Sequence, residues 1–127
     1  MIAVDTSALI AIVLAEREAD ACIAALGADA EVLISAGTLA EVLIVAARRD
    51  LGAEVARLID ALGFEIVAVT PLAARRIADA YLRWGKGRSP AGLNFGDCFA
   101  YDVAKEYACP LLYVGRDFAK TDVESVL

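Results

Sequence analysis

Residues 2–7, Ile-Ala-Val-Asp-Thr-Ser, are a short apolar run that ends in a carboxylate and two hydroxyls. The residues after it are apolar again, and they predict a helix from about Thr6 to Ala15. A short buried strand that leads into a helix is the unit from which parallel sheets are built. The opening of the chain therefore predicts a first strand with Asp5 at its carboxyl end.

The same unit recurs along the chain. Three further apolar runs of strand length lie at 31–34, 65–69 and 110–114. Helical patterns are expected at 16–26, from the turn at 35–38 to about 50, and at 53–62, 71–84 and 95–108, with Gly27 and Gly63 as stops and Thr70-Pro71 as a start. Strands that alternate with helices predict an α/β fold, a three-layer sandwich whose helices cover both faces of a central parallel sheet of at least four strands.

The size and charge of the chain limit its function. Its 127 residues, 60% of them hydrophobic, predict a single domain spanning 1–127. The formal net charge of -6, from 12 basic and 18 acidic residues, predicts that any nucleic-acid binding is local. The chain has no histidine, so histidine triads and histidine metal ligands are excluded.

The location of the protein is predicted from what the sequence lacks. Residues 1–5 do not resemble a secretory signal, and the apolar runs at 8–15 and 42–47 are too short to span a bilayer. The three cysteines, Cys22, Cys98 and Cys109, are too few for a disulfide framework. We expect a soluble cytoplasmic protein that does not contact a membrane.

Asp97 occupies an unusual position in the predicted helix at 95–108. A helical projection places it on the apolar arc, whereas Cys98, Asp102, Lys105 and Glu106 collect on the opposite side, which we interpret as the solvated face. An inward carboxylate requires a cation, hydrogen-bond donors or a raised pKa. The local alternative is that Asn94 caps the helix and Asp97 at position N3 complements its dipole.

Four acids occupy positions that a parallel sheet brings to one edge. Asp5 and Asp117 follow the first and fourth strands, Glu41 lies near the start of the helix after the second strand, and Asp97 near the start of the helix before the fourth. Each also has a local alternative: Asp5 as a helix cap, Thr38 and Glu41 as a capping box, and Asp117 as a turn residue. Glu41 is, however, the only charged residue within 32–47.

A cluster of these carboxylates predicts a metal site. Like charges at short range raise one another's pKa values, so the cluster favours a bound cation. Oxygen ligands select Mg²⁺ or Mn²⁺, and such an ion can activate water and polarise a phosphoryl oxygen. The chemistry that this pattern predicts is phosphodiester hydrolysis.

Polar and basic residues near these positions are candidates for substrate binding. Thr6 and Ser7 could hydrogen-bond a ligand carboxylate, a water or a phosphate, and Lys86 and Arg88 lie in a basic, glycine-rich loop at 85–92. The chain has four other arginines that could reach a nucleic-acid backbone, although a solvated side chain is the simpler interpretation of each. They are Arg48, Arg49, Arg83 and Arg116.

The motifs resemble those of PIN-domain ribonucleases, specifically the VapC-type toxins of bacterial type II toxin-antitoxin modules. The matching stretches are 4–9 (Val-Asp-Thr-Ser-Ala-Leu), 35–41 (Ser-Ala-Gly-Thr-Leu-Ala-Glu), 85–88 (Gly-Lys-Gly-Arg), 93–98 (Leu-Asn-Phe-Gly-Asp-Cys) and 117–122 (Asp-Phe-Ala-Lys-Thr-Asp). The resemblance implies a Mg²⁺- or Mn²⁺-dependent endoribonuclease that acts on RNA as a homodimer and is inhibited by a cognate VapB-type antitoxin.

The resemblance also implies roles for the four acids. Asp5 and Asp97 would be metal ligands, Glu41 a ligand or a base for water, and Asp117 a ligand of a second or water-bridged ion. Two positions depart from the family pattern: Arg116 stands where the first of two acids is common, and Ser89 where a histidine is common.

Other α/β enzymes that begin with an acid after the first strand fit the residues less well. A haloacid dehalogenase-type phosphatase needs a second Asp where this chain has Ser7, and a response-regulator receiver needs an Asp after the third strand, where Val69 is followed by Thr70. The remaining alternative is a catalytically weak PIN scaffold that binds RNA or a protein.

Overall fold

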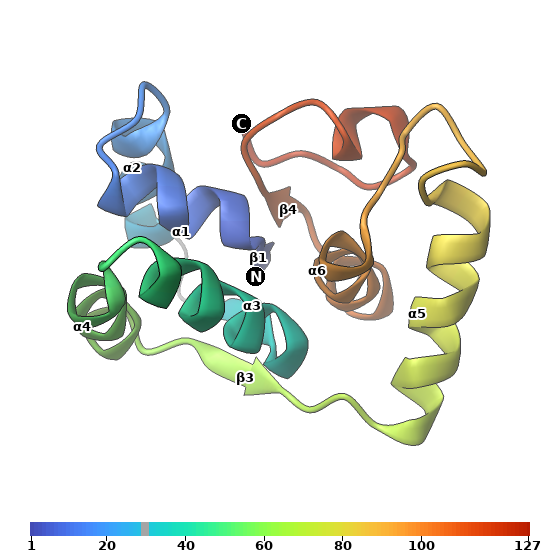
Figure 1. The fold of residues 1–127 in the computed structure, drawn as a ribbon, viewed down its shortest axis with the longest axis horizontal. Helices are drawn as coiled ribbons and strands as arrows, with labels where there is room; N and C mark the ends of the chain where they lie inside the picture. The colour runs from blue at the N-terminus through green and yellow to red at the C-terminus, as the bar shows by residue number, and fades with distance from the viewer. Residues whose placement is uncertain (29–30) are drawn as a thin grey trace.

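The computed structural model describes residues 1–28 and 31–127. Its centre is one sheet of four parallel strands in the order β3-β2-β1-β4 (Figure 1). The strands are β1 (Ile2–Val4), β2 (Val32–Ser35), β3 (Glu65–Val67) and β4 (Leu111–Leu112). In the register, Ala3 lies opposite both Leu33 and Leu111. The predicted α/β fold with a four-stranded parallel sheet is confirmed.

Helices occupy the segments that the sequence predicts, with shifted ends. They are α1 (Thr6–Val13), α2 (Ala19–Ala28), α3 (Ala36–Arg48), α4 (Gly52–Leu62), α5 (Pro71–Trp84), α6 (Phe95–Glu106) and the 3-10 helix η1 (Phe118–Lys120). The first helix ends two residues before the predicted Ala15, which takes a left-handed φ of 51°. The second begins at Ala19 rather than Glu16.

The predicted helix signals at residues 63 and 70–71 have the expected geometry. Gly63 ends α4 with φ 58° and ψ 43°, the left-handed conformation that glycine adopts without steric cost. Thr70 caps α5 by accepting a hydrogen bond from the backbone N–H of Ala73 at 3.1 Å, and Pro71 follows in the first turn.

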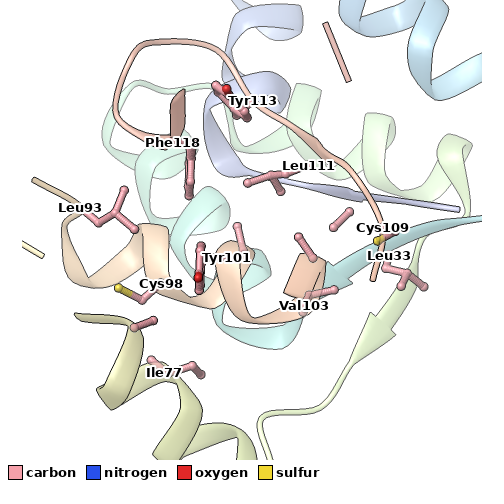
Figure 2. Close-up of a cluster of buried hydrophobic side chains, with 14 of the residues drawn as sticks. Leu33, Ile77, Leu93, Cys98, Tyr101, Val103, Cys109, Leu111, Tyr113 and Phe118 are labelled. Atoms are coloured by element: carbon pink, nitrogen blue, oxygen red, sulfur yellow. The ribbon is translucent and has the colours of Figure 1, made fainter. Parts of the chain in front are cut away.

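The two faces of the sheet are covered by different sets of helices. Because side chains alternate along a strand, Ala3, Leu33 and Leu111 pack with residues of α5 and α6, in the cluster that Figure 2 shows. Their strand neighbours, such as Val4 and Ile34, pack with residues of α1 to α4 on the other face. The sheet is therefore the middle of three layers, as predicted.

Two strands are shorter than their sequences predict. The segment 65–69 has the most regular strand pattern in the chain, yet only residues 65–67 pair, and the strand lies at an edge of the sheet with Ile66 53% exposed. The segment 110–114 pairs over two residues only.

The predicted solvated face of the helix at 95–108 is confirmed for Lys105 and Glu106, which are exposed, and is wrong for Cys98 and Asp102. Cys98 is fully buried, and Asp102 is only 6% exposed. The guanidinium of Arg76 donates to the two carboxylate oxygens of Asp102 at 2.7 and 3.2 Å, which satisfies the buried acid. The reason is that α6 packs against both α3 and α5, as Figure 1 shows, so it has more than one buried face.

The strand order determines where a ligand site forms. From β1 the chain moves outward to β2 and β3, and then returns to the other side of β1 to form β4. The carboxyl ends of β1 and β4 thus lie at a switch point, where loops diverge and leave a crevice.

Candidate active site

Asp5 lies at the end of β1 and is also the N-cap of α1. Its Oδ2 accepts hydrogen bonds from the backbone N–H of Ser7 at 3.0 Å and from the Ser7 hydroxyl at 2.6 Å. Its Oδ1 is buried and has no hydrogen-bond partner among the described residues. Burial, together with the charges of Asp97 and Glu41, raises the pKa of Asp5 to about 7, against the bonds from Ser7 that lower it.

Thr6 and Ser7 hold the acids in place in this structure. The Thr6 hydroxyl donates to Oε1 of Glu41 at 2.6 Å. The Ser7 hydroxyl donates to Asp5 and accepts the backbone N–H of Val114 at 3.0 Å, which links the ends of β1 and β4. Both hydroxyls thus donate to carboxylates of the site, and their binding of a substrate phosphate or a water stays a prediction.

Glu41 does not form the predicted capping box. The N-cap of α3 is Ser35, whose hydroxyl accepts the backbone N–H of Gly37 at 3.1 Å, so Thr38 lies inside the helix. Glu41 instead faces α1 and α6. Gly96 lies so close to it that a Cβ there would overlap the Glu41 carboxylate. Glycine at 96 is therefore what lets the carboxylate occupy this place.

Asp97 has the predicted local role and also lines the cavity beside Asp5. Its Oδ2 accepts the backbone N–H of Asn94 at 2.9 Å, and the Asn94 side chain accepts the backbone N–H of Asp97 at 2.8 Å, which completes a capping box. Burial is the main cause that raises the pKa of Asp97 to about 6, and the charges of Glu41 and Asp117 add to it. The two interpretations of Asp97 are therefore compatible.

One cavity of about 350 Å³ joins these residues. It is lined by Asp5, Thr6, Ser7, Ile10, Glu16, Glu41, Asn94, Asp97 and Val114. Three of the four predicted acids thus lie on one cavity, which we call the acid pocket. Glu16 was missed, because the sequence places it at the start of the second helix; in the structure the backbone N–H of Glu16 bonds to the Ala11 carbonyl at 2.9 Å, and the residue belongs to the turn after α1.

The other predicted residues do not line the acid pocket. Asp117 is exposed before η1, and its charge reaches Asp97, whose pKa it raises. Lys86 is exposed and has the opposite effect on that pKa. Arg88 is exposed, and its Nε donates to the Leu82 carbonyl at 3.3 Å.

The four other arginines that were candidates for contact with a nucleic-acid backbone are all exposed; they are Arg48, Arg49, Arg83 and Arg116. Arg83 lies over the Trp84 ring, 4.6 Å from its centroid, and 3.8 Å from Asp122. Its guanidinium is therefore engaged away from the acid pocket, whereas Arg48, Arg49 and Arg116 form no ion pair with any residue that the structure describes.

The donor set of the acid pocket suits a hard divalent cation. Asp5 offers a buried, unpartnered oxygen, and the raised pKa values of Asp5 and Asp97 show that ionising both carboxylates is unfavourable until positive charge is added. In the described ranges, no three His, Cys, Asp or Glu side chains are gathered closely enough to hold an ion by themselves. Mg²⁺ bound by one or two carboxylates and several waters fits such a site.

Comparison with known proteins gives a consistent result. The PIN domain family model matches residues 2–124. The chain is 43% identical over 127 residues to ribonuclease VapC36 of Mycobacterium tuberculosis, covering 95% of this chain and 90% of that protein. It is 39% identical over 126 residues to ribonuclease VapC of Mycolicibacterium smegmatis, covering 97% and 98%.

Solved structures show the same fold. The M. tuberculosis VapC20 toxin, described as cleaving the sarcin-ricin loop, superposes with a TM-score of 0.80 at 16% identity over 99% of this chain and 98% of that one. A chain of a toxin-antitoxin complex from Klebsiella pneumoniae gives 0.70 at 24% identity, covering 96% and 93%. Within the described residues, no helix has the length and apolar character needed to cross a membrane. From the family model and its curated relatives, the chain belongs to the VapC ribonucleases of the PIN-domain family.

Proposed function

We propose that this chain is an endoribonuclease toxin that hydrolyses phosphodiester bonds of cellular RNA with Mg²⁺ or Mn²⁺, and that the acid pocket is its active site. The observation that carries the proposal is the meeting of Asp5, Glu41 and Asp97 on one cavity, with a buried and unpartnered oxygen on Asp5. The names of relatives about 40% identical, all VapC ribonucleases, support the reaction class.

The metal would be held by Asp5 and Asp97, and Asp117, whose charge raises the Asp97 pKa, would act through a bridging water. A divalent ion supplies a polarised phosphoryl oxygen and a more acidic water. Ser7 orients the Asp5 carboxylate through two hydrogen bonds and leaves Oδ1 available for binding. The Asn94 backbone N–H fixes Oδ2 of Asp97 in the same way.

Glu41 is the proposed acceptor of the proton that the attacking water loses. Thr6 donates to Oε1, and this bond holds the carboxylate at the cavity. Gly96 leaves Oε2 unobstructed by a side chain of α6. A base must lie within hydrogen-bond reach of the attacking water, and a carboxylate that shares the cavity with Asp5 would be placed for this role.

The binding partners are proposed on the same basis. Lys86 and Arg88 in the loop at 85–92 would contact the RNA backbone, and the influence of Lys86 on the Asp97 pKa supports a position near the scissile phosphate. The toxin-antitoxin complex among the structural neighbours supports a cognate VapB-type antitoxin as inhibitor. We also propose a single domain, a homodimer, and action in the cytoplasm.

Cleavage of total RNA tests the function. The wild-type protein is expected to cut RNA with Mg²⁺ and to stop in EDTA, and Asp97→Asn should abolish cutting while the circular dichroism spectrum is unchanged. Asp20→Asn is the matched control, because Asp20 is an exposed acid in the first turn of α2. Full cleavage by Asp97→Asn would refute the assignment, and RNA binding without cleavage by the wild type would favour the scaffold alternative.

A further inference from the structure

A second hollow lies beside the acid pocket, between α3 and α6. It has a volume of about 450 Å³ and is lined by Gly37, Ala40, Glu41, Ile44, Val45, Arg48, Phe95, Gly96 and Phe99. We call it the aromatic groove. Its walls are mostly apolar, and Glu41 lines both hollows, so the aromatic groove and the acid pocket are adjacent.

Two glycines create the aromatic groove. A Cβ at Gly37 would overlap the ring of Phe99, and one at Gly96 would overlap Glu41. The missing side chains allow α3 and α6 to approach closely, which leaves the two phenylalanines of α6 beside the crossing. The ring centroids of Phe95 and Phe99 are 4.9 Å apart, with the ring planes at 70°.

Phe95 is unusually exposed for an aromatic residue. Its exposed fraction is 64%, and Ile44 across the groove is 55% exposed. Phe95 is the first residue of α6 and precedes Asp97 by two positions, so the two differ by about 3 Å along the helix axis. The two side chains point to different sides of α6, Phe95 to the aromatic groove and Asp97 to the acid pocket, so an exposed ring lies in the same helical turn as a carboxylate that we place at the scissile phosphate.

The geometry points to a nucleobase subsite: the aromatic groove receives an unstacked base of the RNA, next to the phosphate that is cut, with the base stacked on Phe95. This inference rests on the proposed function. Proteins recognise single-stranded RNA by stacking its bases on aromatic side chains, and every base has a π-face that can do so. Arg48 on the groove wall supplies a cation for a neighbouring phosphate or for the base plane.

The adjacency of the two hollows favours RNA over a protein as the occupant of the aromatic groove. A phosphodiester bound in the acid pocket carries a nucleoside, and the groove lies on the other side of the same residue, Glu41. A protein that bound the groove would not require the acid pocket beside it.

Binding of short oligonucleotides tests the subsite directly. Fluorescein-labelled oligo-A, oligo-C and oligo-U are compared with an abasic ribose-phosphate chain of equal length, by anisotropy with Ca²⁺ in place of Mg²⁺ to slow hydrolysis. The wild type is expected to bind at least one base-bearing oligonucleotide roughly 5- to 100-fold more tightly than the abasic chain.

Three substitutions separate stacking from general apolar contact. Phe95→Leu keeps apolar bulk without a π-face and should lose most of the preference for bases, whereas Phe95→Trp should keep it. Leu72→Ala is the matched control, because Leu72 is 70% exposed at the start of α5, outside the groove. All variants are expected to fold, since both side chains are largely exposed.

Two results would overturn the subsite. The first is that the wild type binds base-bearing and abasic chains equally, or binds neither detectably. The second is that Phe95→Leu keeps the full preference for base-bearing chains. A change of molar mass in Phe95→Ala by light scattering, without a change in base preference, would assign the groove to protein contacts instead. If the wild type cleaves total RNA with Mg²⁺ while any of these holds, only the subsite fails; absence of metal-dependent cleavage would count against the proposed function itself.

Discussion

Asp97→Asn is expected to stabilise the metal-free protein at about pH 8, although it removes an acid from the first turn of a helix. The folded-state pKa of Asp97 is about 6, raised from 3.8 by burial and by Glu41 and Asp117, so the folded protein binds protons more tightly than the unfolded chain. The ionised form therefore weakens the fold as pH rises from about 4 through 6. A pKa difference of about two units, reduced by solvent screening because Asp97 is only partly buried, corresponds to about 1–2 kcal/mol.

Asparagine keeps the local structure while removing the charge. Its side-chain oxygen can still accept the Asn94 backbone N–H, now 2.9 Å from Oδ2 of Asp97. We expect the melting temperature of Asp97→Asn at about pH 8 in EDTA to exceed the wild-type value by roughly 5–10 °C, and the difference to vanish near pH 4. Saturating Mg²⁺ should make the wild type the variant with the higher melting temperature, because only the wild type is stabilised by binding the ion.

The control has the opposite expected sign. Asp20→Asn also removes a first-turn acid, but Asp20 is exposed on α2 and lies outside the acid pocket, so this change should lower the stability by about 0.3–1 kcal/mol. Differential scanning calorimetry of both variants at the two pH values measures the effects. An unchanged or lower melting temperature for Asp97→Asn at high pH would show that Asp97 acts only at the helix terminus.

Three further outcomes are expected. The metal-free wild type should lose stability to urea as pH rises through about 7, because the folded-state pKa of Asp5 is about 7, and added Mg²⁺ should flatten that loss. Gly96→Ala should reduce RNA cleavage at least about tenfold with little change in circular dichroism, because the new Cβ displaces the Glu41 carboxylate. Arg76→Met should lower the free energy of unfolding by about 2–3 kcal/mol in urea titrations, because it leaves the buried Asp102 unpaired.

Each of these predictions has its own control and its own contradicting result. Gly27→Ala is the control for Gly96→Ala, because a Cβ at Gly27 meets no atom within 4 Å. Undiminished cleavage by Gly96→Ala would contradict a role for the Glu41 position. The double change Arg76→Met with Asp102→Leu should recover most of the stability that Arg76→Met loses, and a further loss would argue against the ion pair as the cause. Stability of the metal-free protein that rises toward pH 8 would contradict the burial of an ionised Asp5.

Local sequence signals predicted most of the fold correctly. Apolar runs of strand length and helical periodicity gave the element order, and Thr70, Pro71 and Gly63 marked helix ends because their backbone preferences act within a few residues. The strand at 65–69 was overestimated because β-propensity does not distinguish an edge strand from a central one.

The failures come from contacts between distant residues. A helical projection assumes one buried arc, but α6 packs against two helices, so Asp102 is buried on the side that the projection assigned to water. Its partner Arg76 is 26 residues earlier, and no local pattern connects them. The same limit explains Glu16, which reaches the acid pocket through the turn that ends α1.

The sequence predicted three of the acids that line the acid pocket, but it did not predict the hydrogen bonds that hold them. Asp5, Glu41 and Asp97 line one cavity, as expected for residues near the carboxyl ends of parallel strands, because those ends meet at one edge of the sheet. Thr6 and Ser7 donate to carboxylates of the site, because a buried carboxylate is the strongest acceptor within their reach, and their binding of substrate stays a prediction. Asp117 lies outside the cavity lining, and its part in metal binding stays a prediction.

The central claim is that the acid pocket holds the catalytic metal ion. Anomalous diffraction at the manganese edge, from crystals grown with Mn²⁺, tests it most directly. We predict an anomalous peak within bonding distance of Oδ1 of Asp5 and of the Asp97 carboxylate, and no such peak in Asp97→Asn crystals. A fully occupied Mn²⁺ site elsewhere, with the acid pocket empty at saturating Mn²⁺, would contradict the account.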